Sequence, residues 1–262
     1  MPLLYDNIIL IIPFLFGAVV GSFLNVCIYR IPAGLSVVSP ASRCSSCGAG
    51  VAFYDNIPIL SYIILRGRCR ACRAPFSVQY PFVEALTGGF AALIFHLYGP
   101  SPEFFVYFVF TAALIVITFI DLEHRIIPDV ISLPGIPIGF AASFFIASPG
   151  WMNSAIGAVL GGGFLLIVSV GYYLLAKRSG MGGGDIKLLA MIGAFLGWKG
   201  VVVTVLLSSF VGAVIGGALM VIAGKKSRYA IPFGPFLAFG ALVYLFIGDI
   251  LIEWYLRFAF GG

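Results

Sequence analysis

The chain has 262 residues, of which 61% are hydrophobic and only 10% charged, and its mean hydropathy is +1.11. This composition lies far outside the range of soluble globular domains and predicts an all-α polytopic membrane protein. The formal net charge is +5. Because the basic residues form no contiguous stripe, we attribute the excess to charge asymmetry across a bilayer and expect no nucleic-acid partner.

Eight apolar stretches are predicted as membrane spans: residues 8–28, 82–98, 104–120, 130–147, 155–176, 188–196, 201–223 and 236–255. No basic residue precedes the first, which is long enough to span, so we expect it to remain as a helix rather than to be removed as a secretory signal. The stretch 188–196 is shorter than the ~20 residues of a straight span, so it is tilted, merged with its neighbour or re-entrant. The sequence therefore predicts seven to eight transmembrane helices.

Basic residues gather in segments that alternate with these spans. If the N-terminus lies outside, one face receives Arg30, Arg43, Arg66, Arg68, Arg70, Arg73, Arg125, Lys177, Arg178, Lys187, Lys225, Lys226 and Arg228, and the other receives Lys199 and Arg257. By the positive-inside rule the first face is cytoplasmic. Asp121 and Asp185, at opposite ends of their spans in sequence, are then predicted to meet this same interface.

Small residues four apart recur inside the apolar stretches, at Gly17 and Gly21, Gly157 and Gly161, and Gly212 and Gly216. Glycines at this spacing let two helix backbones approach closely. We therefore interpret these pairs as helix-packing positions rather than as parts of a site.

Four cysteines form two CxxC pairs in the polar segment after the first span: Cys44 with Cys47, and Cys69 with Cys72. The spacing is typical of a tetrahedral zinc site, and a reducing cytosol argues against two disulfides. Redox pairs or coincidental cysteines are the alternatives. Because four thiolates leave no open coordination position, we expect a structural zinc that folds this cytoplasmic segment. Cys27, within the first span, is interpreted as a core residue.

Carboxylates at the edges of spans are costly there and are therefore candidates for function. Asp121 directly follows an apolar run, whereas Asp129 follows a proline at the position of a helix N-cap, so we favour Asp121 as a chemical group. Asp185 ends a glycine run, where it is either a cap beside a flexible hinge or a catalytic carboxylate on backbone that a substrate can approach. Asp249 and Glu253, near the end of the last stretch, are interpreted as solvated.

Two aspartates that meet at a half-dry interface cannot both ionise cheaply, so such a pair shares one proton. The ionised member can take a proton from an attacking water while the protonated member polarises a peptide carbonyl, which is the chemistry of aspartic proteases. Other hydrolytic motifs are missing from the sequence: it has no phosphate-binding P-loop, no HExxH zinc-protease motif and no GxSxG elbow.

Several segments carry a resemblance to a known family. They are GSFLNVCIYRIP at 21–32, the two CxxC pairs, YDNIPILSY at 54–62, YPFVEALTG at 80–88, TFIDLEHRIIPD at 118–129, GMGGGDIKLLAMIGAFLGW at 180–198 and IPFGPFLAFG at 231–240. In this order they resemble the prepilin peptidases of type IV pilus and type II secretion systems, whose GxGD signature GGGD at 182–185 matches.

This resemblance implies a bacterial inner-membrane enzyme that removes the basic leader of prepilins or pseudopilins on the cytoplasmic side. The catalytic aspartates of the family carry over to Asp121 and Asp185, and its cysteines to the two CxxC pairs. Many members also N-methylate the new N-terminus with S-adenosylmethionine. For this second activity the resemblance points to Gly67, Arg68 and Glu84, although Glu84 equally suits a pair with an arginine that holds the segment on the membrane.

The expected organisation is a first transmembrane helix at 1–28, a cytoplasmic zinc-binding segment at 29–81 that includes the methyltransferase region, and a transmembrane aspartic peptidase domain at 82–262. The expected partners are prepilin-like substrates and the lipid bilayer. Two rival functions remain open: a GxGD intramembrane protease with a non-pilin substrate, and a transporter or zinc-stapled scaffold whose carboxylates bind ions.

Overall fold

The computed structural model describes residues 2–177, 182–222 and 232–261. Within these ranges all named elements are helical, and only two isolated β-bridges occur, both in the cysteine-containing segment. Four basic residues that the topology prediction used, Arg178, Lys225, Lys226 and Arg228, lie outside the described residues. The chain divides into two compact units, Met1–Val116 and Ile117–Gly262.

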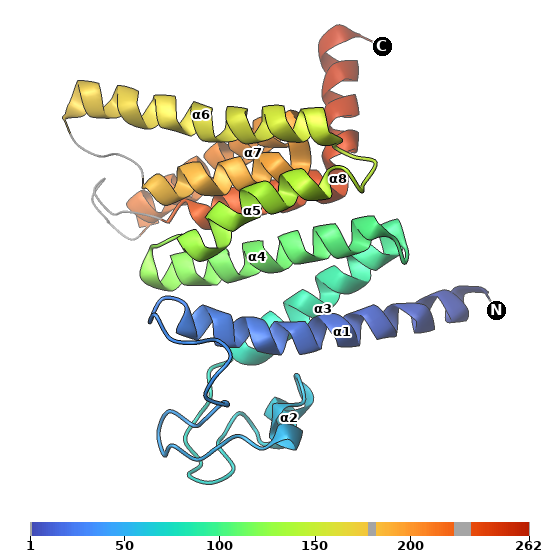
Figure 1. Ribbon diagram of the computed structural model, residues 1–262, viewed down its shortest axis with the longest axis vertical. Coiled ribbons are helices and arrows are strands. Elements are labelled where there is room, and N and C mark those ends of the chain that lie inside the picture. Colours follow the sequence, from blue (N-terminus) through green and yellow to red (C-terminus); the bar gives the residue numbers. More distant parts are fainter. Residues whose placement is uncertain (1, 178–181, 223–231, 262) are drawn as a thin grey trace. The chain divides into compact units, whose positions relative to one another are not determined.

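The first unit is built on two long helices, α1 (Pro2–Arg30) and α3 (Gln79–Tyr98), which pack against each other (Figure 1). Gly17 and Gly21 make this close approach possible, because a Cβ on Gly17 would lie 2.5 Å from the Cβ of Ala91 and one on Gly21 would lie 2.8 Å from the Cα of Glu84. The predicted packing role of this glycine pair is therefore confirmed.

Residues 31–78, here called the cysteine segment, connect α1 to α3. They contain the short 3-10 helix η1 (Phe53–Asn56) and the five-residue helix α2 (Leu60–Ile64). The first unit is completed by the N-terminal part of α4 (Pro102–His124), whose last turns belong to the second unit.

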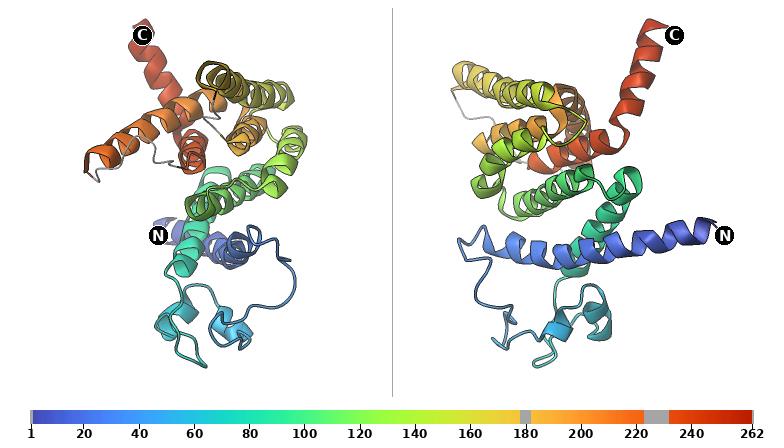
Figure 2. Two further views of the ribbon diagram at one scale, coloured as in Figure 1. Left: turned by 90° about the vertical axis from the view of Figure 1, so that its left-hand side faces the viewer. Right: turned by 45° about the vertical axis from the view of Figure 1, so that its right-hand side comes forward.

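The second unit contains α5 (Asp129–Ala142), α6 (Trp151–Ala176), α7 (Gly183–Ile222) and α8 (Gly234–Phe260). Helix α7 consists of two arms that meet at Gly197, where φ is +73° and the backbone is not helical. Figure 2 shows the two arms running in different directions. The short apolar stretch 188–196 therefore lies in the first arm of α7, merged in sequence with the stretch that follows it.

Glycines again set the contacts of the central helix α7. A Cβ on Gly157 or Gly161 of α6 would overlap backbone atoms of α7, and a Cβ on Gly193 of α7 would overlap the carbonyl group of Gly157. These positions confirm the predicted packing role of the second glycine pair. Gly212 differs, because a Cβ there would make only an ordinary contact of 3.6 Å with Phe236.

Six helices of the described chain are long and apolar enough to cross a membrane, and α5 is a shorter apolar helix of 14 residues. The total of seven apolar helices, or eight if the arms of α7 are counted separately, agrees with the predicted range. The predicted span 130–147 was too long, because α5 ends at Ala142. All-α polytopic architecture with a cysteine cluster between the first two spans is thus confirmed.

Candidate active site and metal centre

Asp121 lies in the last turns of α4 and is buried, with 4% of its surface exposed. Its Oδ2 accepts a hydrogen bond of 3.0 Å from the backbone N–H of Gly234, the first residue of α8. Free N–H groups at a helix N-terminus favour a negative charge. A Cβ at position 234 would stand 2.6 Å from the same Oδ2, so the approach requires glycine.

Asp185 is the third residue of α7 and is also buried, with 9% exposed. Its carboxylate accepts a hydrogen bond from the backbone N–H of Gly182, while its own backbone N–H donates to the carbonyl oxygen of Gly182 over 3.2 Å. The carboxylate thus makes only the N3 half of a capping box, since Gly182 has no side chain to complete it, and the second bond joins backbone to backbone. The negative charge of Asp121 also acts on Asp185, so the fold places the two buried carboxylates in one electrostatic environment.

Ile127 lies between the first turns of the two helices that position these carboxylates. A Cβ on Gly184 would be 2.8 Å from Cβ of Ile127, and one on Gly234 would be 3.3 Å from Cδ1 of Ile127. The same side chain therefore contacts the start of α7, which bears Asp185, and the start of α8, which holds Asp121.

Asp129 is not a helix cap, because the N-cap of α5 is Pro128 and makes no side-chain capping bond. Instead, both carboxylate oxygens of Asp129 accept hydrogen bonds of 2.8 Å from Nζ of Lys187. This ion pair joins the first turn of α5 to the first turns of α7. This ion pair was not predicted from the sequence.

The four Sγ atoms of Cys44, Cys47, Cys69 and Cys72 all lie within 4.8 Å of one another. Sγ of Cys44 and Sγ of Cys72 are 3.8 Å apart. A zinc ion with four bonds to sulfur of about 2.3 Å defines a tetrahedron with edges of about 3.8 Å. The cluster therefore fits a tetrahedral metal ion, and the predicted ligands are brought together.

The two CxxC pairs form equivalent turns. In the first, the N–H of Cys44 donates to Ala49 and that of Gly48 donates to Cys44; in the second, Cys69 pairs with Ala74 and Arg73 with Cys69 in the same way. Backbone N–H groups of Cys47 and Ser46 lower the pKa of the Cys44 thiol to about 6. A lowered pKa favours the thiolate, which is the form of cysteine that binds metal.

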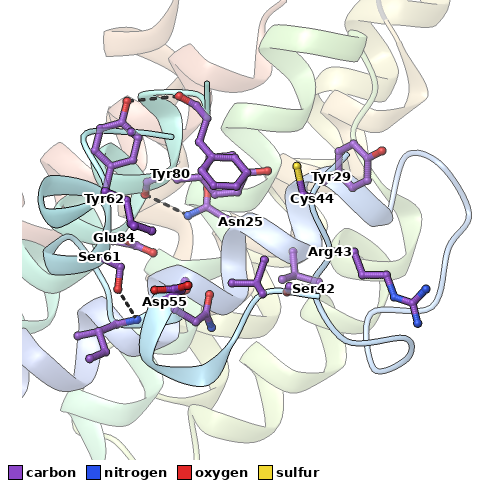
Figure 3. A pocket seen from close by; sticks show the side chains of 18 of the residues that line it. Asn25, Tyr29, Ser42, Arg43, Cys44, Asp55, Ser61, Tyr62, Tyr80 and Glu84 are labelled. Atoms are coloured by element: carbon purple, nitrogen blue, oxygen red, sulfur yellow. Dashed lines mark hydrogen bonds between the residues drawn. The ribbon is translucent and has the colours of Figure 1, made fainter. Parts of the chain in front are cut away.

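A cavity of about 330 Å³ lies between the cysteine segment and the ends of α1 and α3. Figure 3 shows Asp55, Ser61, Tyr62 and Glu84 gathered on one side of it, with Arg43 extending away from them. All three residues predicted for a methyl-donor site, Gly67, Arg68 and Glu84, contribute to its wall.

Glu84 holds the cysteine segment onto α3, although not through an arginine. Its Oε2 accepts a 2.7 Å hydrogen bond from the backbone N–H of Ile59, and its carboxylate is also hydrogen-bonded to Ser22 of α1. Among the described residues, the ion pairs do not include Glu84. The alternative of an arginine pair is thus corrected to a backbone contact.

Gly67, which also lines the cavity, has a φ of +65°, and a Cβ there would lie 2.7 Å from the ring of Tyr62.

The second CxxC turn is tied to the cavity wall by an ion pair. Nε of Arg70, between Cys69 and Cys72, donates to Oδ2 of Asp55 over 2.8 Å, and the guanidinium lies 5.6 Å from the ring centroid of Tyr54. The guanidinium also lowers the pKa of the Asp55 carboxyl. Asp55 was not singled out from the sequence, since an isolated Asp in a loop gives no signal.

Comparison with known protein families gives two matches along the chain. A model of the bacterial peptidase A24 N-terminal domain matches residues 15–98, and a model of the type IV leader peptidase family matches residues 108–217. The chain belongs to the type IV leader peptidase family. It is therefore a peptidase, and the resemblance noted in its sequence motifs is confirmed.

Curated relatives cover nearly the whole chain. A prepilin leader peptidase/N-methyltransferase of Aeromonas hydrophila is 35% identical over 98% of this chain and 95% of its own, and one of Legionella pneumophila is 36% identical over 93% of each. One of Pseudomonas putida is 36% identical over 89% of this chain and 88% of its own. No solved structure matches the chain.

Proposed function

We propose that this enzyme removes the leader peptide of prepilins or pseudopilins with Asp121 and Asp185 as its catalytic pair. The observation that carries the proposal is the burial of both carboxylates in one electrostatic environment, each against a backbone N–H at the start of a helix. The names of the curated relatives supply the class of substrate.

In the proposed reaction the two carboxylates share one proton, because two neighbouring buried charges cannot both be sustained. The ionised carboxylate takes a proton from water as the water oxygen attacks the scissile carbonyl carbon, and the other carboxyl gives its proton to the carbonyl oxygen. The C–N bond then breaks as the amine nitrogen receives a proton from the pair. Ile127 and the buried residues around the pair limit the access of other water.

We place this site on the cytoplasmic side of the inner membrane. Within the second unit, Arg125 follows the end of α4 that bears Asp121, and Lys187 lies in the first turns of α7, which bear Asp185. Lys177 follows the end of α6, the helix that precedes α7 in the chain. The positive-inside rule assigns such an end to the cytoplasm. A substrate with a basic leader and an apolar helix presents its junction at this interface.

We further propose that the cavity in the first unit holds S-adenosylmethionine for N-methylation of the new N-terminus. Its volume lies within the usual range of small-molecule sites, about 300–1,000 Å³. Glu84 and Asp55 offer carboxylates to ammonium or hydroxyl groups, Arg68 can pair a carboxylate, and Tyr62 and Tyr80 offer ring faces that suit a cation. When bound, this cofactor supplies an electrophilic methyl group.

The four-cysteine cluster is proposed as a structural zinc site. With all four coordination positions filled by thiolates, the ion has no place for a substrate. Its role is to fold a segment in which few residues are buried, and through Arg70 and Asp55 it supports the wall of the cavity.

One experiment tests both activities. The purified enzyme is incubated with a prepilin and S-adenosylmethionine, and the product mass is measured. The expected product lacks the leader and is heavier by one methyl group than the bare mature chain. Cleavage only of helices without a basic leader would favour a non-pilin protease, and ion flux without any peptide product would favour a transporter.

A further inference from the structure

Four large apolar side chains within residues 53–64 of the cysteine segment, here called the apolar row, are exposed. The exposed fractions are 87% for Phe53, 50% for Leu60 and 65% for both Ile63 and Ile64. Leu60, Ile63 and Ile64 belong to α2, which Figure 1 labels, and Phe53 is the first residue of η1. Large side chains with this much exposed surface are costly in water.

The opposite side of the same residues is already occupied. Asp55, Ser61 and Tyr62 line the cavity, and Oγ of Ser61 accepts from the N–H of Ile57 over 3.1 Å while donating to the carbonyl of Tyr54 over 3.0 Å. These bonds fix which face points inward. The apolar row therefore cannot turn into the unit without breaking the cavity wall.

The contact between Glu84 and Ile59 fixes this row near the end of a membrane span. Glu84 lies in the second turn of α3, whose residues 79–98 form a candidate span, and the 2.7 Å bond to Ile59 places the start of α2 beside that turn. Two exposed arginines, Arg66 and Arg68, directly follow the apolar row. An apolar face bordered by basic residues is the pattern of segments that lie in the membrane interface.

We propose that residues 53–64 dock onto the adjacent leaflet of the bilayer. Phe53, Leu60, Ile63 and Ile64 enter the boundary between headgroups and acyl chains, and Arg66, which does not line the cavity, pairs with the phosphates of anionic lipids. The apolar helix of a protein substrate is the other conceivable occupant. Lipid is favoured because anionic headgroups complement the arginines, whereas the basic leader of the proposed substrate would meet like charge.

This docking fixes the position of the cavity relative to the membrane surface. Its wall at Ser61 and Tyr62 belongs to the same short segment as the membrane-facing row, so the lipid surface holds that wall while Glu84 holds it from α3. The mouth of the cavity is then kept close to the membrane surface. This inference concerns lipid contact and stands whether or not the cavity takes S-adenosylmethionine.

The direct test uses a photo-crosslinking amino acid. p-Benzoylphenylalanine replaces Ile64, or in a matched control Ala41, an exposed residue of the same segment outside the row. The full chain is placed in lipid nanodiscs containing phosphatidylglycerol, illuminated and analysed by mass. We expect a lipid adduct at position 64 that clearly exceeds that at position 41. Equal adducts, no adduct at 64, or a protein adduct that replaces lipid when a prepilin is added would overturn the proposal.

Hydrogen exchange supplies the second measurement. Since burying one isoleucine side chain shifts an equilibrium by roughly tenfold or more, Ile63→Ser with Ile64→Ser should speed exchange of residues 53–64 by about a hundredfold in nanodiscs. Val38→Ser, an exposed apolar residue outside the row, should leave it unchanged. Arg66→Gln should reduce the difference between phosphatidylglycerol and phosphatidylcholine nanodiscs. Exchange that is equally fast in the parent and the double variant would contradict lipid docking.

Discussion

The backbone N–H of Gly234 donates a 3.0 Å hydrogen bond to Oδ2 of Asp121. This contact ties the start of α8 to the last turns of α4 and fixes the orientation of the carboxylate. Because position 234 has no Cβ, the helix start can approach to this distance. The proposed catalytic pair thus depends on a residue that carries no functional side chain.

Gly234→Ala should impair cleavage because it displaces the Asp121 carboxylate, not because it removes a reacting group. The added Cβ would lie 2.6 Å from Oδ2 of Asp121 and must displace it. Since a misplacement of about 1 Å can cost roughly a hundredfold in rate, we expect kcat to fall by about that factor with KM little changed. Gly212→Ala, where a Cβ makes only an ordinary contact, is the matched control for steady-state kinetics. Equal kcat values for the two variants would refute this role.

The ion pair between Lys187 and Asp129 should act on the alignment of α7. Lys187→Asp alone should lower kcat severalfold, while Lys187→Asp with Asp129→Lys should recover most of it, because the exchanged charges can pair again. The effect on stability should stay below about 1 kcal/mol, since the pair is partly exposed. Cleavage kinetics of the single and double variants measure this recovery.

Glu253 and Arg257 provide the control for that experiment, as they form a more exposed pair at 3.8 Å within α8. Reversing Arg257 to Asp should leave kcat unchanged. A double exchange at 129 and 187 that is no better than the single change would show that pairing is not the reason for any loss.

The contact of α6 with α7 should tolerate no side chain at Gly193. A Cβ there would overlap the carbonyl of Gly157, and Gly193→Val should therefore destabilise the second unit by about 1–3 kcal/mol or more. Gly163→Val, on α6 with open space around it, should leave the thermal midpoint in detergent within a few degrees of the parent. Similar midpoints for both variants would mean that the helices do not meet as closely as described.

Removal of the metal should separate the two proposed activities. A chelator, or Cys44→Ser with Cys72→Ser, should unfold the cysteine segment and abolish methylation, while cleavage persists at a reduced level because the aspartates lie in the other unit. Cys27→Ser, which leaves the cluster intact, should retain zinc in metal analysis and keep both activities. A protein purified without zinc whose methylation is intact would contradict the structural role.

Hydropathy and cysteine spacing were sufficient to predict the helical membrane fold and the four-cysteine cluster, because both depend on patterns local in sequence. The end of α5 was missed since the apolar run continues past Ala142 and composition alone does not mark where a helix stops. The sequence left three possibilities for 188–196, and the non-helical backbone at Gly197 sets this stretch apart as the first arm of α7.

The contacts that hold the proposed catalytic pair in place were harder to predict from the sequence. The motif containing Gly234 was recognised, but its N–H contact with Asp121 joins helices far apart in sequence. Asp129 was interpreted as a cap because it follows a proline, and its partner Lys187 could not be inferred without the packing of α5 on α7. For Glu84 the sequence left two alternatives open, a methyl-donor contact and an arginine pair that holds the segment; the partner that holds the segment is a backbone N–H, which no residue identity could indicate.

The catalytic pair itself is tested most directly by Asp121→Asn and Asp185→Asn, which keep the size of each side chain while removing its charge. Cleavage of a purified prepilin is measured by product mass, and methylation of a substrate already cut is measured on the same preparations to show that they are folded. We predict that each variant loses cleavage and retains methylation. Cleavage that persists in either variant would contradict the assignment of the pair.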